Sequence, residues 1–196
     1  MSKPLWLGRA TAEDPPALAA LESECYSHPW TQRQFREEVS YGPPGAVLLL
    51  RSPAASVVAW RGIQAYCAYR VVVDEMHILN VAVAPACRRR GIARWLLGFA
   101  IGQAARSGAV RALLEVRESN VEARALYAAM GFVGLGTRRD YYSEPVENAV
   151  VLSLDSFNSL METVHLLKSP ANAAHLARSV AQYRSGEARE RKLPDE

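Results

Sequence analysis

A basic turn that contains a glycine follows the apolar segment ILNVAVAP, residues 78–85, and leads into an amphipathic segment. The turn contains Arg88, Arg89 and Arg90 and then Gly91. A helix that begins here would present unpaired backbone N–H groups and the positive end of its dipole. The glycine would let a ligand approach that backbone closely. The combination predicts a pyrophosphate site, and a solvated basic turn without a ligand is the alternative.

Two further side chains have types suited to proton transfer. Glu115 lies in the apolar segment ALLEV, residues 112–116. A fully buried glutamate without a partner is rare, so we expect this residue to have a function or an ion-pair partner. Tyr127 lies in NVEARALYAAMGF, residues 120–132. From its residue type alone, a core position with the hydroxyl on a carbonyl group is the better interpretation.

The elements that must position these residues alternate between strand and helix. Content of β-branched and aromatic residues predicts the strands, and helical spacing of apolar residues predicts the helices. The passage strand–helix–strand–helix in the middle implies locally parallel strands. We therefore expect a mixed α/β fold, with a mixed central sheet flanked by helices; SPAASVVAWRG, residues 52–62, stays ambiguous. The expected strands are 5–10, 46–50, 63–73, 75–85, 112–116, 133–142 and 148–154, and the expected helices are 11–26, 32–40, 87–108 and 120–132.

Composition excludes several classes of protein. The net charge of +3 over 196 residues is too small to predict nucleic-acid binding by itself. The cysteines, Cys25, Cys67 and Cys87, are odd in number and lack C-x-x-C spacing, which argues against a disulfide framework or a zinc site and suits a reducing cytosol. No apolar run reaches the roughly 18 residues of a membrane span, and the N terminus has no signal-peptide pattern. We expect a soluble cytoplasmic protein without a metal site or a membrane partner.

The segment VAVAPACRRRGIARWLL, residues 81–97, resembles the acetyl-CoA-binding signature of the GNAT family of N-acetyltransferases, with Arg88-x-x-Gly91-x-Ala93 at its centre. The usual second glycine is Ala93 here, which slightly crowds the turn. The segments SHPWT, DEMHILNVAV, LLEVRESNVEARALYAAMGF and GTRRDYY resemble the RimI-type protein-alanine N-acetyltransferases in the same order. The resemblance covers roughly residues 5–154. It implies the GNAT fold and acetyl-CoA as cosubstrate.

The resemblance also implies a role for individual residues. Glu115 matches the proton acceptor and Tyr127 the proton donor of a direct transfer without an acyl-enzyme. An α-amine with a pKa of roughly 7.7–8.0 is mostly protonated at neutral pH, so a carboxylate near it suits this chemistry. Cys87, beside the turn, is the candidate for a covalent alternative, although cysteine is often a small core residue. The implied acetyl-CoA-binding residues are Val81, Ala82, Val83, Arg88, Arg89, Arg90, Gly91, Ile92, Ala93, Arg94 and Asn120.

The acceptor implied by the resemblance is a protein N terminus, namely the alanine of a small-subunit ribosomal protein. Trp30, Tyr141 and Tyr142 lie where the family lines its peptide groove, and ordinary aromatic packing is the alternative for all three. Two other functions stay open. One is acetylation of a different amine, such as a lysine side chain, a small molecule or an aminoacyl-tRNA. The other is a toxin-binding protein in which the acetyltransferase part is only a scaffold.

The C-terminal segment has a different pattern. Residues 155–169 are amphipathic, and Ser169 and Pro170 begin a second predicted helix that Gly186 ends. Residues 149–193 resemble the C-terminal part of Phd/YefM-family antitoxins, a region that wraps a RelE/YoeB-type ribonuclease toxin. The DNA-binding part of that family has no counterpart in this sequence, so no direct DNA binding is expected.

The two resemblances predict an acetyltransferase domain over residues 1–154 and a helical antitoxin-like extension over residues 155–196. They meet at VVLSL, residues 150–154, which could serve as a strand in both families. The extension could bind a toxin by folding on binding. It could also pack on the enzyme or mediate self-association.

Overall fold

The structure is a computed structural model, and it describes residues 6–52 and 62–155. Most of the ambiguous segment 52–62 and both predicted helices of the extension lie outside the described residues. The elements, in chain order, are β1 Trp6–Arg9, α1 Pro15–Cys25, α2 Gln32–Tyr41, β2 Ala46–Arg51, β3 Ile63–Val72, β4 Glu75–Val83, a 3₁₀ turn Pro85–Cys87, α3 Ile92–Arg106, β5 Arg111–Arg117, α4 Val121–Ala129, β6 Val133–Ser143 and β7 Val146–Leu154.

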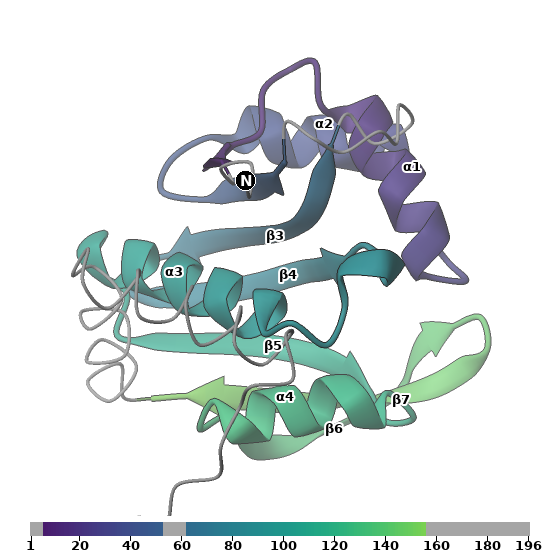
Figure 1. Ribbon diagram of the computed structural model, residues 1–196. Helices are drawn as coiled ribbons and strands as arrows, with labels where there is room; N and C mark the ends of the chain where they lie inside the picture. Colours follow the sequence, from purple (N-terminus) through teal and green to yellow (C-terminus); the bar gives the residue numbers. More distant parts are fainter. Residues whose placement is uncertain (1–5, 53–61, 156–196) are drawn as a thin grey trace, which may run out of the picture. The chain divides into compact units, whose positions relative to one another are not determined.

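The strands form a seven-stranded sheet in the order β1-β2-β3-β4-β5-β7-β6 (Figure 1). Neighbouring strands are antiparallel except for β4 and β5, which are parallel and connected through α3. The mixed α/β fold and its parallel pair are therefore confirmed. The last described strand, β7, lies between β5 and β6 and not at the sheet edge.

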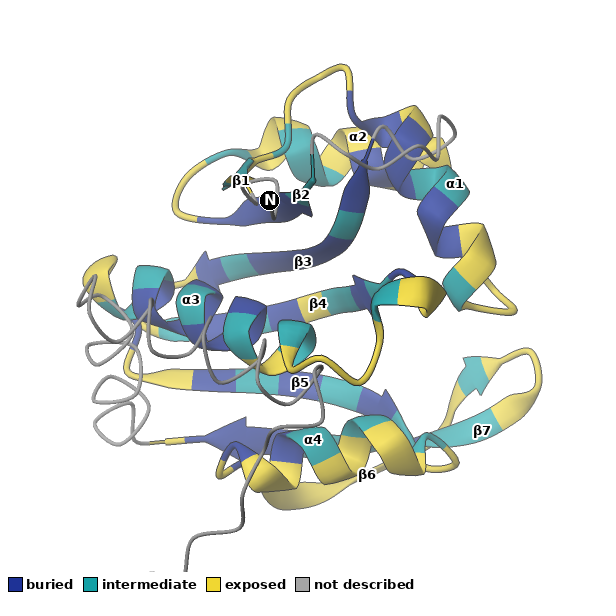
Figure 2. Cartoon of the chain, viewed as in Figure 1, coloured by how far each residue is buried: buried dark blue, intermediate teal, exposed yellow. Residues whose placement is uncertain are grey.

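Helices cover both faces of the sheet. On one face, α1 and α2 pack through residues such as Leu18, Leu21 and Phe35 onto Tyr66 of β3 and Ala82 of β4. Residues that alternate with these along β3 are also buried and lie under α3 (Figure 2). The buried stripe of α3 is Leu96, Leu97, Ala100, Ile101 and Ala104. No helix in the described residues is long and apolar enough to cross a membrane.

The pairing of β4 with β5 ends at a β-bulge in β4. Ala68 of β3 pairs with Asn80, whereas the next residue, Tyr69, pairs with Ile78, so Leu79 is the extra residue. In the described chain, pairing of β4 with β5 covers residues 75–78 of β4 only. Beyond the bulge the two strands separate toward their C-terminal ends (Figure 1). The sheet is thus split at the point where both predicted site strands end.

The helix after the basic turn begins later than predicted. It starts at Ile92 and not at residue 87, because residues 85–87 form a 3₁₀ turn and Gly91 adopts a left-handed conformation with φ of 74°. Arg89 also has a positive φ, 61°. Two left-handed residues end the turn and let α3 begin directly after it. The glycine is required for its backbone conformation, since a Cβ on Gly91 would meet no atom within 4 Å.

Candidate active site

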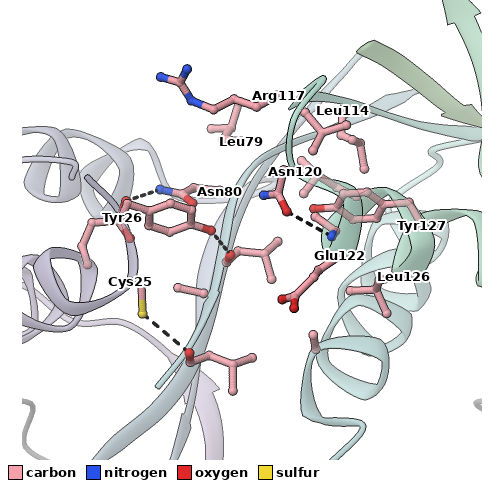
Figure 3. A pocket seen from close by; sticks show the side chains of 18 of the residues that line it. Cys25, Tyr26, Leu79, Asn80, Leu114, Arg117, Asn120, Glu122, Leu126 and Tyr127 are labelled. Carbon is pink, nitrogen blue, oxygen red and sulfur yellow. Dashed lines mark hydrogen bonds between the residues drawn. The ribbon is translucent and has the colours of Figure 1, made fainter. Parts of the chain in front are cut away.

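A cavity of about 950 Å³ lies in the split between β4 and β5 (Figure 3). It is bounded by the end of α1, the turn before α3, and α4. Every residue predicted for the site lines this cavity except Arg90, which is exposed beside it. The predicted residues brought together here are Trp30, Val81, Ala82, Val83, Arg88, Arg89, Gly91, Ile92, Ala93, Arg94, Glu115, Asn120, Tyr127, Tyr141 and Tyr142.

At the end of β4, every second residue directs its backbone N–H and C=O groups into the cavity. The N–H of Ala84 donates to the carbonyl of Gln64 in β3 at 2.8 Å. Because backbone direction alternates along a strand, Val83 and Val81 point the opposite way, into the split. The hydroxyl of Tyr26 reaches the carbonyl oxygen of Val81 from that side. The N–H groups of Val81 and Val83 face the same side and can donate to a ligand.

The turn before α3 presents positive charge and backbone donors together. The first turn of α3 has unpaired N–H groups, and Gly91 at its start carries no capping side chain. Arg88, Arg89 and Arg94 lie around this helix end and line the cavity. Arg88 also donates to the Val83 carbonyl at 3.2 Å, which ties the turn to β4. Such a helix end favours an anionic group such as a pyrophosphate.

Helix α4 forms the opposite wall. Its cap, Asn120, accepts a hydrogen bond from the Ala123 N–H at 3.1 Å, so its amide nitrogen is turned outward. Tyr127 is 9% exposed and packs against Phe132 with ring centroids 5.6 Å apart. Burial raises the pKa of Tyr127 well above its usual range. In Figure 3 its hydroxyl points toward Tyr26 across the split. Tyr127 is therefore both a core residue and a cavity residue, and its hydroxyl stays protonated at neutral pH.

Glu115 of β5 has an ion-pair partner. Its Oε1 lies 3.2 Å from Nη1 of Arg138 in β6, and its side chain is 29% exposed. Ile78 and Leu114 are paired and so share a face of the sheet. The side chain of Glu115 therefore points to the other face, where Arg70 contacts Glu38 of α2. This carboxylate is thus reachable from the cavity on the side of α1 and α2.

The aromatic residues predicted for the acceptor groove are partly engaged in packing. Trp30 stacks at a tilt on the core residue Phe35, with centroids 5.4 Å apart. Tyr141 and Tyr142 meet edge to face at 5.1 Å. The guanidinium of Arg117 lies 4.1 Å from the Tyr142 ring centroid, within cation–π range. All three residues also line the cavity, so their packing does not exclude the predicted role.

Two loops meet at the end of the cavity where the acceptor groove is predicted. His28, in the connection between α1 and α2, has Nε2 3.3 Å from a carboxylate oxygen of Glu144, between β6 and β7. Both residues line the cavity, and neither belongs to the predicted set. The segments SHPWT and GTRRDYY predicted this end of the cavity, but no local pattern connects His28 to Glu144, which is more than 100 residues away along the chain.

Glu22 of α1 is a buried carboxylate that the sequence pattern did not reveal. It is 1% exposed and lies at the cavity wall. Its Oε1 accepts from Nδ2 of Asn80 at 2.7 Å and from the N–H of Trp30 at 3.3 Å, and Oε2 accepts from the hydroxyl of Tyr66. Burial raises the pKa of Glu22, although these hydrogen bonds oppose the shift. Its partner Asn80 is 58 residues away, so no local pattern connects the two.

Glu22→Gln is expected to raise the melting temperature at neutral pH by a few degrees. The folded-state pKa of Glu22 is raised, so its contribution to stability is complete below its ordinary value of about 4.5 and is lost as the pH rises through the folded value. Glutamine carries no charge to bury, and it can keep the hydrogen bonds. The gain should therefore shrink toward pH 4, measured by calorimetric melting across pH.

The matched control is Asp14→Asn, at the other end of α1. Burial alone would raise the pKa of Asp14, but hydrogen bonds from the Thr11 backbone and Arg51 make it lower than usual. This variant should lose stability at neutral pH, and the loss should vanish in acid. A Glu22→Gln protein that melts lower than the parent at pH 7 would contradict the account of Glu22.

Two family profiles match the chain. The acetyltransferase (GNAT) family matches residues 16–132. The antitoxin Phd_YefM family, of type II toxin-antitoxin systems, matches residues 146–186. The second match begins at the first residue of β7, so the antitoxin-like segment includes a strand of the described sheet.

Relatives and solved structures agree with the first match. The [ribosomal protein bS18]-alanine N-acetyltransferase of Salmonella typhimurium is 35% identical over 144 residues, which are 72% of this chain and 90% of that protein. The crystal structure of the Escherichia coli ribosomal-protein-S18-alanine N-acetyltransferase superposes with a TM-score of 0.68 and 29% identity, over 78% of this chain and 95% of that one. Arabidopsis thaliana NAA60 in complex with acetyl-CoA is similar in fold alone, with a TM-score of 0.69 and 14% identity, over 78% and 99% of the two chains.

Proposed function

The chain belongs to the GNAT family of acetyltransferases, and on that basis we propose that it transfers the acetyl group of acetyl-CoA to the α-amine of a protein N terminus, in the first place an N-terminal alanine of a small-subunit ribosomal protein. The observation that carries this proposal is the 35% identity to a ribosomal-protein alanine N-acetyltransferase over 90% of that relative. An N-acetyltransferase with this sequence and fold is an acyltransferase. The acceptor protein and the roles of individual residues are the proposed part.

The cavity has groups that suit acetyl-CoA. The N–H groups of Val81 and Val83 face the split, where they can donate to carbonyl oxygens. The start of α3 and its arginines can hold the pyrophosphate. When bound, acetyl-CoA supplies an activated acetyl thioester. The N–H of Val81 is then placed to stabilise negative charge on the thioester oxygen, in the manner of an oxyanion hole.

Two proton transfers are needed, and Glu115 and Tyr127 each carry out one of them. Glu115 takes a proton from the acceptor ammonium, directly or through water, because the amine can attack only in its neutral form. Arg138 orients this carboxylate from β6. Tyr127 donates its proton to the departing sulfur, and its raised pKa keeps that proton in place until it is needed. The transfer is direct, and Cys87 remains a lining residue of the turn without a covalent role.

Tyr127→Phe is expected to slow turnover roughly 10²-fold, as expected for loss of a general acid. The affinity for acetyl-CoA, measured by calorimetry, should stay within about twofold, because the ring and its packing on Phe132 remain. Tyr69→Phe is the control, since Tyr69 is also a buried tyrosine but does not line the cavity. If Tyr127→Phe weakens acetyl-CoA binding as much as it slows turnover, Tyr127 is mainly a cofactor contact.

The direct test of the acceptor compares two short peptides with acetyl-CoA. One carries a free N-terminal alanine and no lysine; the other is blocked at its N terminus and has one free lysine. The proposal expects transfer to the alanine peptide only. Transfer to the lysine peptide alone would contradict the proposal. Transfer to neither peptide, while acetyl-CoA still binds, would indicate that the acceptor is another class of amine. Steep dependence of turnover on salt concentration would favour a tRNA-linked amine.

A second function, toxin binding, is favoured by the match of residues 146–186 to Phd_YefM antitoxins. We propose that this segment binds a RelE/YoeB-type ribonuclease toxin. The full chain should retain such a toxin in a pull-down, and a chain ending at Asp155 should not. Failure of the full chain under conditions where a Phd/YefM antitoxin succeeds would rule this function out.

A further inference from the structure

The hydrogen bonds of Glu22 fix the orientation of one amide in the cavity. A carboxylate oxygen can only accept a hydrogen bond, so Asn80 must direct its amide nitrogen, Nδ2, to Glu22. The amide oxygen, Oδ1, is then turned away from Glu22. Within the described residues no donor reaches Oδ1, and Asn80 lines the cavity (Figure 3). The amide oxygen of Asn80 is therefore an oriented hydrogen-bond acceptor that is open to a ligand in the cavity.

The position of Asn80 suits an incoming amine. Asn80 directly follows the bulge residue Leu79 and precedes Val81, whose backbone faces the split. It pairs with Ala68, which packs with α1 and α2, so Asn80 and Glu115 project from the same face of the sheet. An acceptor amine that enters from this face would pass Asn80 on its way to the thioester.

Glu22 also holds the connection between α1 and α2, which contains Trp30. Its Oε1 accepts from the N–H of Trp30 as well as from Asn80, so one oxygen atom ties the loop after α1 to the end of β4. The hydroxyl of buried Tyr66 fixes the other oxygen. In the described part of the chain, none of the ion pairs includes Glu22. Burying a carboxylate without a cation is costly, which indicates a role beyond stability.

We propose that Asn80 binds the acceptor's amino group through its amide oxygen, and that Glu22 is the positioning residue that orients Asn80 and anchors the loop at Trp30. This inference rests on the proposed function, because it assigns the amine end of the acceptor site. An amine or ammonium group donates N–H hydrogen bonds, and the oriented Oδ1 accepts one. The hydrogen bond holds the nitrogen beside Val81 while Glu115 takes its proton.

The test measures KM and kcat for the alanine peptide together with calorimetric affinity for acetyl-CoA. Asn80→Ser removes the amide oxygen and leaves a small polar side chain in its place. It is expected to raise KM roughly tenfold or more, the cost of losing a hydrogen bond to a charged group. Affinity for acetyl-CoA should stay within about twofold, which also shows that the variant is folded. A folded Asn80→Ser protein with the parent KM overturns the role of Asn80.

Two substitutions at Glu22 separate orientation from charge. Glu22→Leu removes the anchor and should raise KM about as much as Asn80→Ser. Glu22→Gln can still accept from both Asn80 and Trp30 through its amide oxygen, so its KM should stay within about threefold of the parent. If Glu22→Leu leaves KM unchanged, Glu22 does not position the site. If Glu22→Gln raises KM as far as Glu22→Leu, the negative charge attracts the ammonium and the positioning role is overturned.

Two controls complete the experiment. Asp14→Asn removes a buried carboxylate at the N-terminal cap of the same helix, outside the cavity lining, and should change stability without changing KM. Binding of the peptide to the CoA-loaded protein, measured by calorimetry, gives the same comparison without turnover. A parent protein that neither binds nor acetylates the alanine peptide overturns the proposed function and this inference with it. Parent activity with an unaffected Asn80→Ser variant overturns the inference alone.

Discussion

Glu115→Gln is expected to lower turnover at pH 7 by about 10²- to 10³-fold and to recover part of the loss at higher pH. An N-terminal amine has a pKa of roughly 7.7–8.0, so at pH 7 most acceptor molecules must lose a proton before they attack. A carboxylate that takes this proton contributes typically about 10²–10⁴ in rate. Above pH 9 most of the amine is already neutral, and Glu115 has less to contribute. The measurement is kcat for the alanine peptide from pH 6 to pH 10.

The shape of the pH profile decides the role of Glu115. Loss of a base should leave a rate that keeps rising with pH until the amine itself has titrated. Loss of a structural ion pair with Arg138 should lower the rate by the same factor at every pH. Glu75→Gln is the control, because Glu75 also contacts cationic partners on this sheet, His77 and Arg111, but does not line the cavity. A Glu115→Gln protein with the parent rate and profile removes Glu115 from the mechanism.

The part of the site that depends on local pattern could be predicted from the sequence. The turn from Arg88 to Arg94 could be located because an apolar strand, a glycine and an amphipathic helix occur in succession. Asn120 could be placed at the start of a helix because asparagine is a favoured cap. The parallel pair of β4 and β5 could be inferred from the helix between them, since a parallel crossover needs such a connection. The signals for the turn and for Asn120 each lie within about 20 residues of chain. The signal for the parallel pair is the continuous strand–helix–strand unit of residues 75–117.

The features that depend on distant partners could not be predicted in this way. The bulge at Leu79 carries no glycine or proline, because it is set by how β4 pairs with β3. The contact of Glu22 with Asn80 joins a helix to a strand across 58 residues. Arg90 is the converse case: it matches the family turn as well as its neighbours do, yet it lies outside the cavity lining. Residue type and spacing identified the turn, but the direction of each side chain came only from the fold.

The position of β7 also shows what a strand prediction leaves out. Its residue content predicted a strand at residues 148–154, and the structure extends it to Val146–Leu154. The pattern does not say which neighbours a strand pairs with. After a hairpin turn from β6, β7 inserts beside β5 and pairs residues Ala149–Leu154 with Ala112–Arg117. The strand at which the antitoxin match begins is therefore an internal strand of the acetyltransferase sheet.

The internal position of β7 predicts how far the chain can be shortened from its C terminus without loss of acetyltransferase activity. A chain that ends at Asp155 keeps β7 and should acetylate the alanine peptide at the full-length rate, within about twofold. A chain that ends at Pro145 lacks β7 and should lose cooperative unfolding and more than about 99% of its activity. The truncation removes the buried residues Ala149, Leu152 and Leu154 and leaves β5, the strand of Glu115, without one neighbour.

A full-length variant separates the contribution of β7 from that of the extension, residues 155–196. Leu152→Asp places a charge at a residue that is 8% exposed in β7, while every residue of the extension stays present. It should unfold like the chain ending at Pro145, as monitored by circular dichroism on heating. Val146→Asp is its control, because Val146 is 67% exposed at the start of the same strand and should tolerate the charge. If the chain ending at Pro145 stays folded and active, β7 belongs functionally to the antitoxin-like segment; if only the chain ending at Asp155 does, the acetyltransferase needs β7 but not the extension.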